Sequence, residues 1–166
     1  MHPSRLPNTT HGLRPRGLAL VVFFPSLIYP KKEKEIHQGR KRIDIVMNNG
    51  ARGGIFANLH QVRKLPSAFV CFECKNYTTE VVNPELDQLS GRFAVNRGKV
   101  GFLCCRTFED RAVFVERCRD TLRDDRGLIL PLDDAAVLAL LGEIGSGRRS
   151  DLNDRLTQLV DEVWLS

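Results

Sequence analysis

One stretch of the chain reads Phe69-Val70-Cys71-Phe72-Glu73-Cys74-Lys75, an apolar run that ends in an acid and a base. Its apolar residues would occupy both faces, which predicts a central β-strand over residues 68–75. Because side chains alternate along a strand, Glu73 and Lys75 share one face at its carboxyl end. An unpaired buried ion is costly or becomes neutral, so charges kept inside such a strand indicate a function.

A second strand-like stretch, Arg42-Ile43-Asp44-Ile45-Val46, lies upstream and contains one acidic residue. Together with residues 34–37 and the glycine-containing turn at 38–40, it predicts a β-hairpin. Alternation puts Asp44 on the face opposite the isoleucines that flank it. Asp44 therefore points away from the most apolar side of its strand.

The rest of the chain alternates between strand-like and helix-like patterns. A helix is predicted to begin at Asn83, which is followed by a proline, and to carry Gln88 and Arg92 on one stripe. Thr107 is predicted to cap the next helix. Further expected elements are a buried helix or strand at 18–29, a loop at 48–54, a short helix at 55–62, strands at 100–105 and 128–132, and a helix from Asp133 or Asp134 to about Glu143. This order predicts an α/β fold with a mixed central β-sheet flanked by helices.

With 166 residues, the chain suits one domain with a sizeable core. We expect a disordered N-terminal segment at 1–16, a domain at 17–144, a linker at 145–149 and an amphipathic C-terminal helix at 150–166. The formal net charge is +5, but Arg5, Arg14 and Arg16 all lie in the first sixteen residues. The folded part is therefore mildly basic, which permits a polyanionic partner without requiring one.

The chain has five cysteines in apolar surroundings, an odd number without the spacing of a disulfide framework. They predict a protein of the reducing cytoplasm. A zinc site that combines Cys71 and Cys74 with Cys104 and Cys105 is the alternative. However, strand residues that are adjacent or three apart point to opposite faces. We therefore expect the cysteines to act as small buried hydrophobic residues.

The apolar run Leu18–Phe24 follows arginines and superficially resembles the start of a secretory signal. Pro25 interrupts the run, a small-residue cleavage site is missing, and the charged segment Lys31–Glu35 follows closely. A membrane span needs about 18 or more apolar residues, so this run is too short. A first helix or strand of the domain is the better interpretation, and we expect no membrane partner.

Two carboxylates and a lysine at the ends of neighbouring strands suit phosphodiester hydrolysis. A divalent ion binds phosphoryl oxygen, lowers the pKa of water and stabilises the leaving oxygen. Mg²⁺ prefers oxygen ligands, which Asp44, Glu73 and the backbone carbonyl of Cys74 would supply, with Mn²⁺ as a substitute. Lys75 would position the attacking water and offset the charge of the phosphate.

The Glu73-Cys74-Lys75 triplet has little value by itself. The chain has seven lysines and twenty acidic residues, so about one such D/E-x-K triplet is expected by chance. An ordinary salt bridge between Glu73 and Lys75 at a strand end is therefore the alternative interpretation. The surroundings favour a site, because a strand with a lone aspartate precedes the triplet and a helix bearing Gln88 follows it.

Four segments, Tyr29–Ile45, Phe72–Tyr77, Asn83–Phe93 and Asn96–Gly98, resemble the PD-(D/E)XK nucleases, and more narrowly bacterial restriction-endonuclease-like proteins. The resemblance covers about residues 27–140. It implies a restriction-endonuclease-like core and a Mg²⁺-dependent endodeoxyribonuclease, with Asp44, Glu73 and Lys75 as active-site residues. It also implies that Gln88 matches the helix glutamine of many members, and that Glu35, with His37 nearby, matches an additional acidic position.

The chain departs from the family pattern at two places. Ile43 precedes the aspartate where the family often has proline, and no acidic residue precedes Lys31, where a longer leading helix usually carries one. A catalytically inactive nucleic-acid-binding or assembly module that keeps the fold is therefore the alternative function. Arg92, Arg97 and Lys99 are candidates for nucleic-acid binding, and a solvated basic face is the alternative for them. DNA is the expected partner, while RNA and a homodimer stay open.

Overall fold

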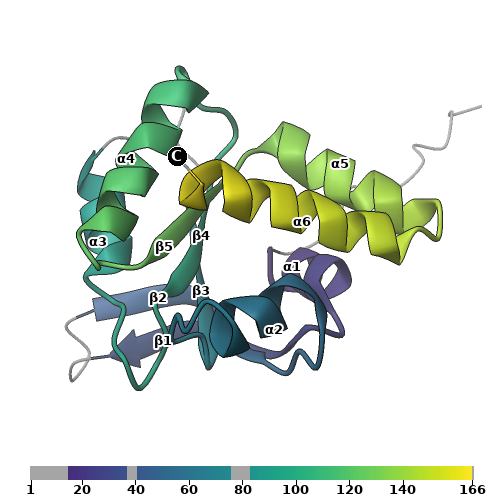
Figure 1. Cartoon of the computed structure of the whole chain (residues 1–166), viewed down its shortest axis with the longest axis horizontal. Helices are drawn as coiled ribbons and strands as arrows, with labels where there is room; N and C mark the ends of the chain where they lie inside the picture. Colours follow the sequence, from purple (N-terminus) through teal and green to yellow (C-terminus); the bar gives the residue numbers. More distant parts are fainter. Residues whose placement is uncertain (1–14, 37–40, 76–82, 166) are drawn as a thin grey trace, which may run out of the picture.

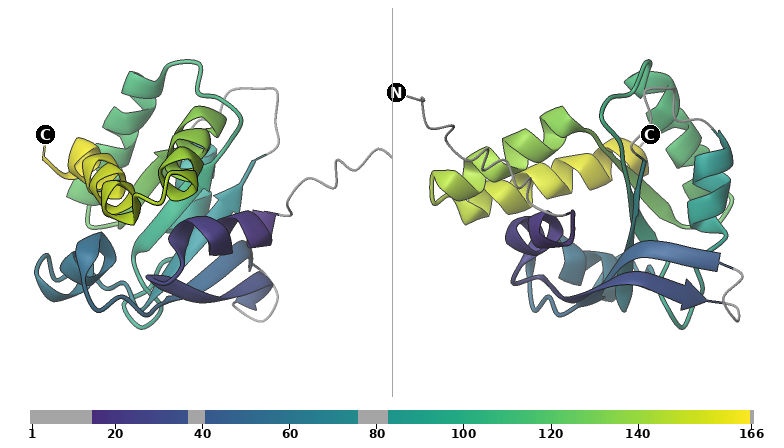
Figure 2. Two further views of the ribbon diagram at one scale, coloured as in Figure 1. Left: turned by 90° about the vertical axis from the view of Figure 1, so that its right-hand side faces the viewer. Right: turned by 180° about the vertical axis from the view of Figure 1, so that it is seen from behind.

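The computed structural model describes residues 15–36, 41–75 and 83–165. Along the chain, its elements are α1 (Pro15–Phe23), β1 (Leu27–Ile36), β2 (Lys41–Asn49), α2 (Gly54–Gln61), β3 (Phe69–Cys74), α3 (Asn83–Ser90), β4 (Val100–Cys104), α4 (Arg111–Arg123), β5 (Leu128–Leu132), α5 (Asp134–Gly145) and α6 (Arg149–Trp164). They form an open five-stranded sheet with helices on both faces (Figures 1 and 2). The predicted α/β class and the mixed sheet are thus confirmed.

The strands lie in the order β1-β2-β3-β4-β5, so spatial order follows chain order. β1 pairs with β2, and β2 with β3, in antiparallel fashion, whereas β3, β4 and β5 are parallel. The β1–β2 hairpin lies crosswise to β4 and β5 in Figure 1, which reflects the twist of the sheet. Helices α3 and α4 cover one face, and α1, α2, α5 and α6 cover the other (Figure 2).

Aromatic packing defines the face under α1 and α2. Phe72 of β3 and Phe102 of β4 are register partners, and their rings stack with centroids 5.0 Å apart. Phe23 of α1 contacts both rings, at 5.1 and 4.9 Å, and Phe56 of α2 packs against Phe23 and Phe102. The sequence predicts a buried helix or strand at the apolar run 18–29. In the structure, this run forms most of α1, which packs over these rings, and then the start of β1.

Glycines allow the opposite face to pack closely. A Cβ atom at Gly101 of β4 would lie 3.0 Å from the ring of Phe93 and 3.1 Å from the carbonyl oxygen of Cys71. Gly98, just before β4, has φ +131°, and a Cβ atom there would lie 2.2 Å from the carbonyl oxygen of Phe69. The turn that contains Gly98 therefore touches the start of β3, and Phe69 N donates to the Arg97 carbonyl at 2.9 Å.

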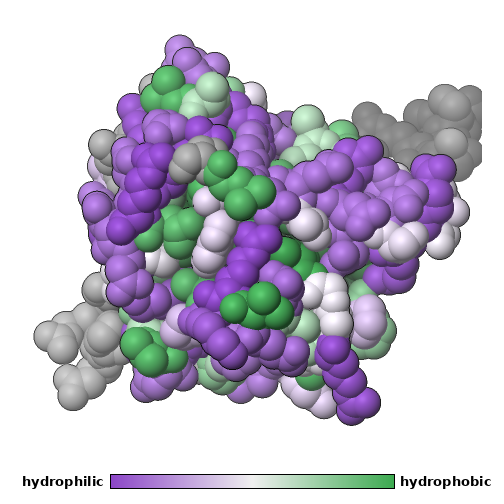
Figure 3. Space-filling view, viewed as in Figure 1, coloured by the Kyte–Doolittle hydropathy of each residue, from purple (hydrophilic) through white to green (hydrophobic). Residues whose placement is uncertain are grey.

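Helix α6 belongs to the same core as the rest of the domain. Leu152, Leu156, Val160 and Val163 are buried, and Leu159 is partly buried against the same core. The outer face of α6 is mostly hydrophilic in Figure 3, as expected for an amphipathic helix. Residues 146–148 separate it from α5, so the expected linker is shorter than 145–149.

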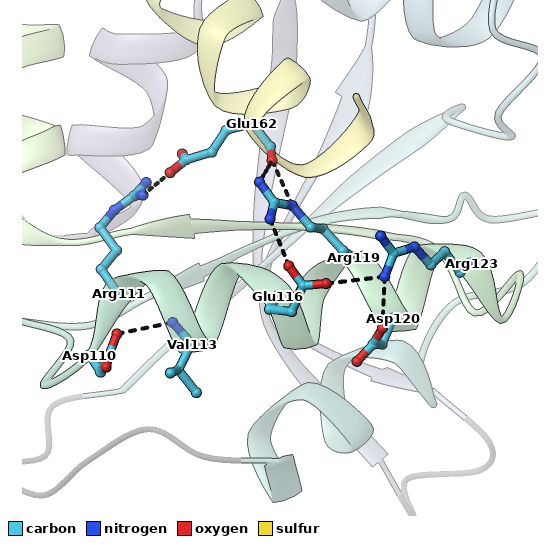
Figure 4. A network of polar contacts seen from close by, with 8 residues as sticks. All are labelled: Asp110, Arg111, Val113, Glu116, Arg119, Asp120, Arg123 and Glu162. Atoms are coloured by element: carbon cyan, nitrogen blue, oxygen red, sulfur yellow. Dashed lines mark hydrogen bonds and ion pairs between the residues drawn. The ribbon is translucent and has the colours of Figure 1, made fainter. Parts of the chain in front are cut away.

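Arginines join α4 to α6 at the edge of the sheet (Figure 4). Arg111 at the start of α4 forms an ion pair with Glu162 of α6. Arg119 donates to the backbone carbonyl of Glu162 through Nε at 3.0 Å and NH2 at 2.8 Å, and its NH1 pairs with Glu116 at 2.7 Å. The C-terminal helix is therefore held by polar contacts as well as by its apolar stripe.

Two expected boundaries were wrong. The cap of α4 is Asp110 rather than Thr107, because the Asp110 carboxylate accepts a hydrogen bond from Val113 N at 3.0 Å. Phe108, between them, is instead buried and stacks on Phe114. Helix α1 begins at Pro15, inside the segment 1–16 expected to be disordered, and residues 1–14 lie outside the described part.

Among the helices that the structure describes, none is long and apolar enough to cross a membrane.

The substitution Gly98→Ala should lower the free energy of unfolding by at least about 2 kcal/mol, because the positive φ and the clash with the Phe69 carbonyl both act against a side chain. The measurement is urea unfolding followed by circular dichroism. Gly142→Ala in α5 is the control, because a Cβ atom there meets nothing within 4 Å and alanine favours the helix. Equal stability of both variants would contradict this account.

Candidate active site

Asp44 lies where the ladder between β2 and β3 ends. The last backbone pair of that ladder is Ile45 with Phe72. Beyond this pair, the bond between the strands is made by a side chain instead of the backbone: Asp44 Oδ2 accepts a hydrogen bond from Cys74 N at 2.8 Å. This bond fixes the half-buried carboxylate at the carboxyl end of β3, beside Glu73.

Glu73 is a buried carboxylate with two cationic partners. The residue is only 3% exposed. Its Oε1 accepts a hydrogen bond from Lys75 Nζ at 2.8 Å, and its Oε2 is bound by Arg92 NH1. Burial of an ion is tolerated when it is paired and hydrogen-bonded, and Glu73 meets both conditions.

Helix α3 brings Gln88 to this cluster. Lys75 Nζ donates to Gln88 Oε1 at 2.8 Å as well as to Glu73, so the helix and the strand share one ammonium group. Two of the three N–H donors of Lys75 are thereby engaged. The structure thus brings together the four residues predicted to be catalytic, Asp44, Glu73, Lys75 and Gln88.

Arg92 follows α3 in a turn, where its backbone N–H donates to the Leu89 carbonyl at 3.0 Å. Burial lowers the pKa of Arg92 from its ordinary value, and the negative charge of Asp44 acts in the opposite direction. Its Nε is buried without a hydrogen-bond partner among the described residues. Arg92 therefore binds the carboxylate of Glu73, while the charge of Asp44 acts to raise its pKa.

This position of Arg92 differs from the surface expected of a nucleic-acid contact. The residue is 6% exposed and serves Glu73. Its expected stripe with Gln88 was the signal in the sequence, but that spacing does not reveal a buried carboxylate as the partner. Arg92 is thus part of the candidate site as the partner of Glu73, whereas the sequence suggested a nucleic-acid contact.

The other two proposed nucleic-acid contacts lie elsewhere. Arg97 NH2 donates to the Arg92 carbonyl at 3.1 Å, so this residue braces the turn after α3. Lys99 binds the Asp125 carboxylate at 3.0 Å and its carbonyl at 2.9 Å. Because Lys99 precedes β4 and Leu103 is the register partner of Glu73, about four residues or roughly 13 Å of strand separate Lys99 from the site.

The additional acidic position and its neighbour are only partly described. Glu35 belongs to β1 and is the register partner of Arg42 on β2. Arg42 and Asp44 are two residues apart on β2, so Glu35 lies opposite a position two residues from Asp44. His37 lies outside the described residues. A role for either residue stays a prediction.

Two thiols lie on the other face of the sheet, directly behind this cluster. Cys74 of β3 and Cys104 of β4 are register partners on this face. Interaction with the Cys104 thiol lowers the pKa of the Cys74 thiol. The same interaction raises the pKa of the Cys104 thiol, and burial raises it further. Sequence spacing had put the cysteines on opposite faces, and only the pairing of β3 with β4 brings these two together.

Carboxylate and carbonyl oxygens are the ligand types that a hard divalent cation prefers. Asp44 and Glu73 carry carboxylate oxygens, and the Cys74 carbonyl lies between Glu73 and Lys75 in the chain. Within the three described ranges, no group of three or more His, Cys, Asp or Glu side chains is arranged to hold a metal ion. A cation at Glu73 would share that carboxylate with Lys75 and Arg92.

Comparisons of the chain with protein-family models, with curated proteins and with solved structures each find no match.

The substitution Arg92→Met should lower the free energy of unfolding by about 3–5 kcal/mol, because it leaves the buried Glu73 carboxylate without one of its partners. Denaturant unfolding measures the change. Arg106→Met is the matched control, since Arg106 pairs with Asp134 at 3.4 Å on the surface and should change stability by less than about 1 kcal/mol. If the two variants lose equal stability, the burial argument for Arg92 fails.

Proposed function

We propose that the protein is a divalent-metal-dependent nuclease that hydrolyses phosphodiester bonds in DNA, with the PD-(D/E)XK arrangement of residues. The observation that carries the proposal is the convergence of four side chains at the carboxyl end of β3. Lys75, which directly follows β3, binds Glu73 of β3 and Gln88 of α3, and Asp44 of β2 accepts a hydrogen bond from Cys74 N, between Glu73 and Lys75 in the chain. These are the residues for which the resemblance implies catalytic roles. The mixed sheet flanked by helices is compatible with the restriction-endonuclease-like core that the resemblance also implies.

Asp44 and Glu73, with the carbonyl of Cys74, are the groups that would hold Mg²⁺ or Mn²⁺. When bound, the cation would supply a Lewis acid for the phosphoryl oxygen and lower the pKa of water. The hydrogen bond from Cys74 N keeps one oxygen of Asp44 in place, so the second strand presents its carboxylate in a fixed orientation. The cation site would thus rest on strands, which position groups more precisely than loops do.

Lys75 would position the attacking water. Its Nζ is held by Glu73 and Gln88, both at 2.8 Å, which leaves one N–H donor for a water or a phosphate oxygen. A fixed ammonium group at this place also stabilises the charge that develops on the phosphate. Gln88 acts through Lys75 and is therefore a positioning residue.

Arg92 would set the strength of the metal site. Its guanidinium neutralises the Glu73 carboxylate and therefore competes with a cation for it. Metal binding would therefore require Glu73 to exchange part of its contact with Arg92. We expect a modest affinity for Mg²⁺ as a result.

Purified protein should cut supercoiled plasmid DNA in Mg²⁺ and stop when EDTA is added. Asp44→Asn and Glu73→Gln should each lower the cleavage rate by at least about 100-fold, because they remove the charge of a proposed metal ligand. Glu116→Gln is the control, since Glu116 is an exposed acid on α4 that binds Arg119 and Arg123. Cleavage that survives in Asp44→Asn would exclude the proposed centre.

Gln88→Leu should lower cleavage by about 10–100-fold without loss of metal affinity, because it releases Lys75 and leaves the acids in place. Lys75→Met should cost more, since it removes the group that contacts the water. Rates at saturating Mg²⁺, with Mg²⁺ affinity measured by calorimetry, separate the two effects. A weaker metal affinity in Gln88→Leu, with an unchanged rate at saturation, would contradict this division of roles.

One observation favours the alternative function, a catalytically inactive nucleic-acid-binding or assembly module. Both carboxylate oxygens of Glu73 are already engaged by cationic side chains, an arrangement that also braces a fold. Such a module would bind DNA with an affinity that falls as salt rises and would not cleave it in Mg²⁺. The plasmid assay above distinguishes the two functions.

A further inference from the structure

Cys74 and Cys104 form a pair of thiols that the proposed nuclease chemistry does not use. They are register partners at the carboxyl ends of β3 and β4. In a parallel pair, register partners project from the same face, here the face of Phe72 and Phe102. Both residues are half-buried and carry free thiols.

A cavity of about 150 Å³ lies next to this pair. Helices α1 and α5 form one side of the cavity, where Ala19, Val22 and Val137 line it. The sheet forms the other side and contributes both thiols. Cys105 also borders the cavity, but its Sγ donates to the Thr107 carbonyl at 3.3 Å. The lining is mainly apolar, so a small uncharged molecule is the kind of reagent that would enter.

The backbone geometry is suitable for a covalent link between the two cysteines. Neighbouring strands lie about 4.8 Å apart, and disulfides span Cα separations of about 4.4–6.8 Å. Cys71 is excluded as a partner because it lies on the opposite face, three residues before Cys74. The pair therefore meets the Cα separation that a disulfide requires.

We propose that Cys74 and Cys104 are a reversible redox site that hydrogen peroxide converts into a disulfide across β3 and β4. The sulfur of one cysteine attacks a peroxide oxygen, which forms an S–O bond and breaks the O–O bond. The thiol proton joins the departing hydroxide to give water. The second thiol then attacks the sulfenic sulfur, which forms the S–S bond and releases a second water. Two thiols are oxidised and one molecule of hydrogen peroxide is reduced.

The disulfide would act on the candidate active site through the backbone of Cys74. The N–H of this residue holds Asp44, and the residues on either side of it are Glu73 and Lys75. A bond that ties the Cys74 side chain to β4 shifts these groups relative to one another, and small shifts at an active site are costly. Oxidation should therefore switch off cleavage. This effect rests on the proposed function, whereas the disulfide itself does not.

The test treats the reduced, full-length protein with hydrogen peroxide, blocks the remaining thiols with iodoacetamide and maps peptides by mass spectrometry. The expected product is one cross-linked peptide that joins Cys74 to Cys104 and disappears on treatment with dithiothreitol. Cys105→Ser should still form it, because the serine hydroxyl can donate to the same Thr107 carbonyl. A Cys104–Cys105 disulfide, or oxidation of Cys74 to a sulfinic acid without cross-linking, would overturn the proposal.

Plasmid cleavage by the reduced and oxidised wild-type protein tests the consequence. Oxidation should reduce the cleavage rate at least about 10-fold, and dithiothreitol should restore it. Equal cleavage by both forms would refute the switch while the nuclease assignment stands. If the reduced protein does not cleave, the proposed function fails, and the peptide map still decides whether the redox site exists.

Discussion

The burial of the Glu73 carboxylate is the constraint on which the candidate site depends. A charge inside a sheet must be paired, and the partners have to come from elements that can reach the end of β3. Lys75 directly follows the same strand, and Arg92 comes from the turn after α3. Helix α3 must therefore pack against this end of the sheet, and that placement also brings Gln88 to Lys75. One buried acid thus organises a strand, a helix and a turn.

Cys74 connects the two faces of the sheet. Its backbone N–H holds Asp44 on the side of α3, while its thiol lies with Cys104 beneath α1 and α5. Successive side chains of a strand lie on opposite faces of the sheet, so a chemical change at a side chain on one face rarely alters polar groups on the other. A cross-strand link at this position acts on a backbone group that belongs to the acidic cluster, and this is why the thiol pair is of interest for regulation.

Most of the elements could be predicted from the sequence. Alternation identified β2 and a continuous apolar run identified β3, while caps identified α3 and α5 and amphipathic periodicity identified α6. The start of α4 was missed because Thr107 and Asp110 are both good caps, and the choice depends on Phe108, which is buried against Phe114. β1 begins at Leu27, earlier than the predicted strand at 34–37, because its pairing with β2 continues past an irregularity between Ile28 and Lys31. Such outcomes depend on packing and pairing, which a local pattern does not contain.

The sequence by itself determined which residue types stand at the ends of which strands, and hence that Asp44, Glu73, Lys75 and Gln88 are candidates for one site. Alternation and helical spacing are local properties, so they can be inferred from adjacent letters. Only the tertiary structure decided the partners across elements: Arg92 for Glu73, Cys74 N for Asp44, and Cys104 for Cys74. These contacts depend on strand register and helix docking, which are set by the packing of the whole core.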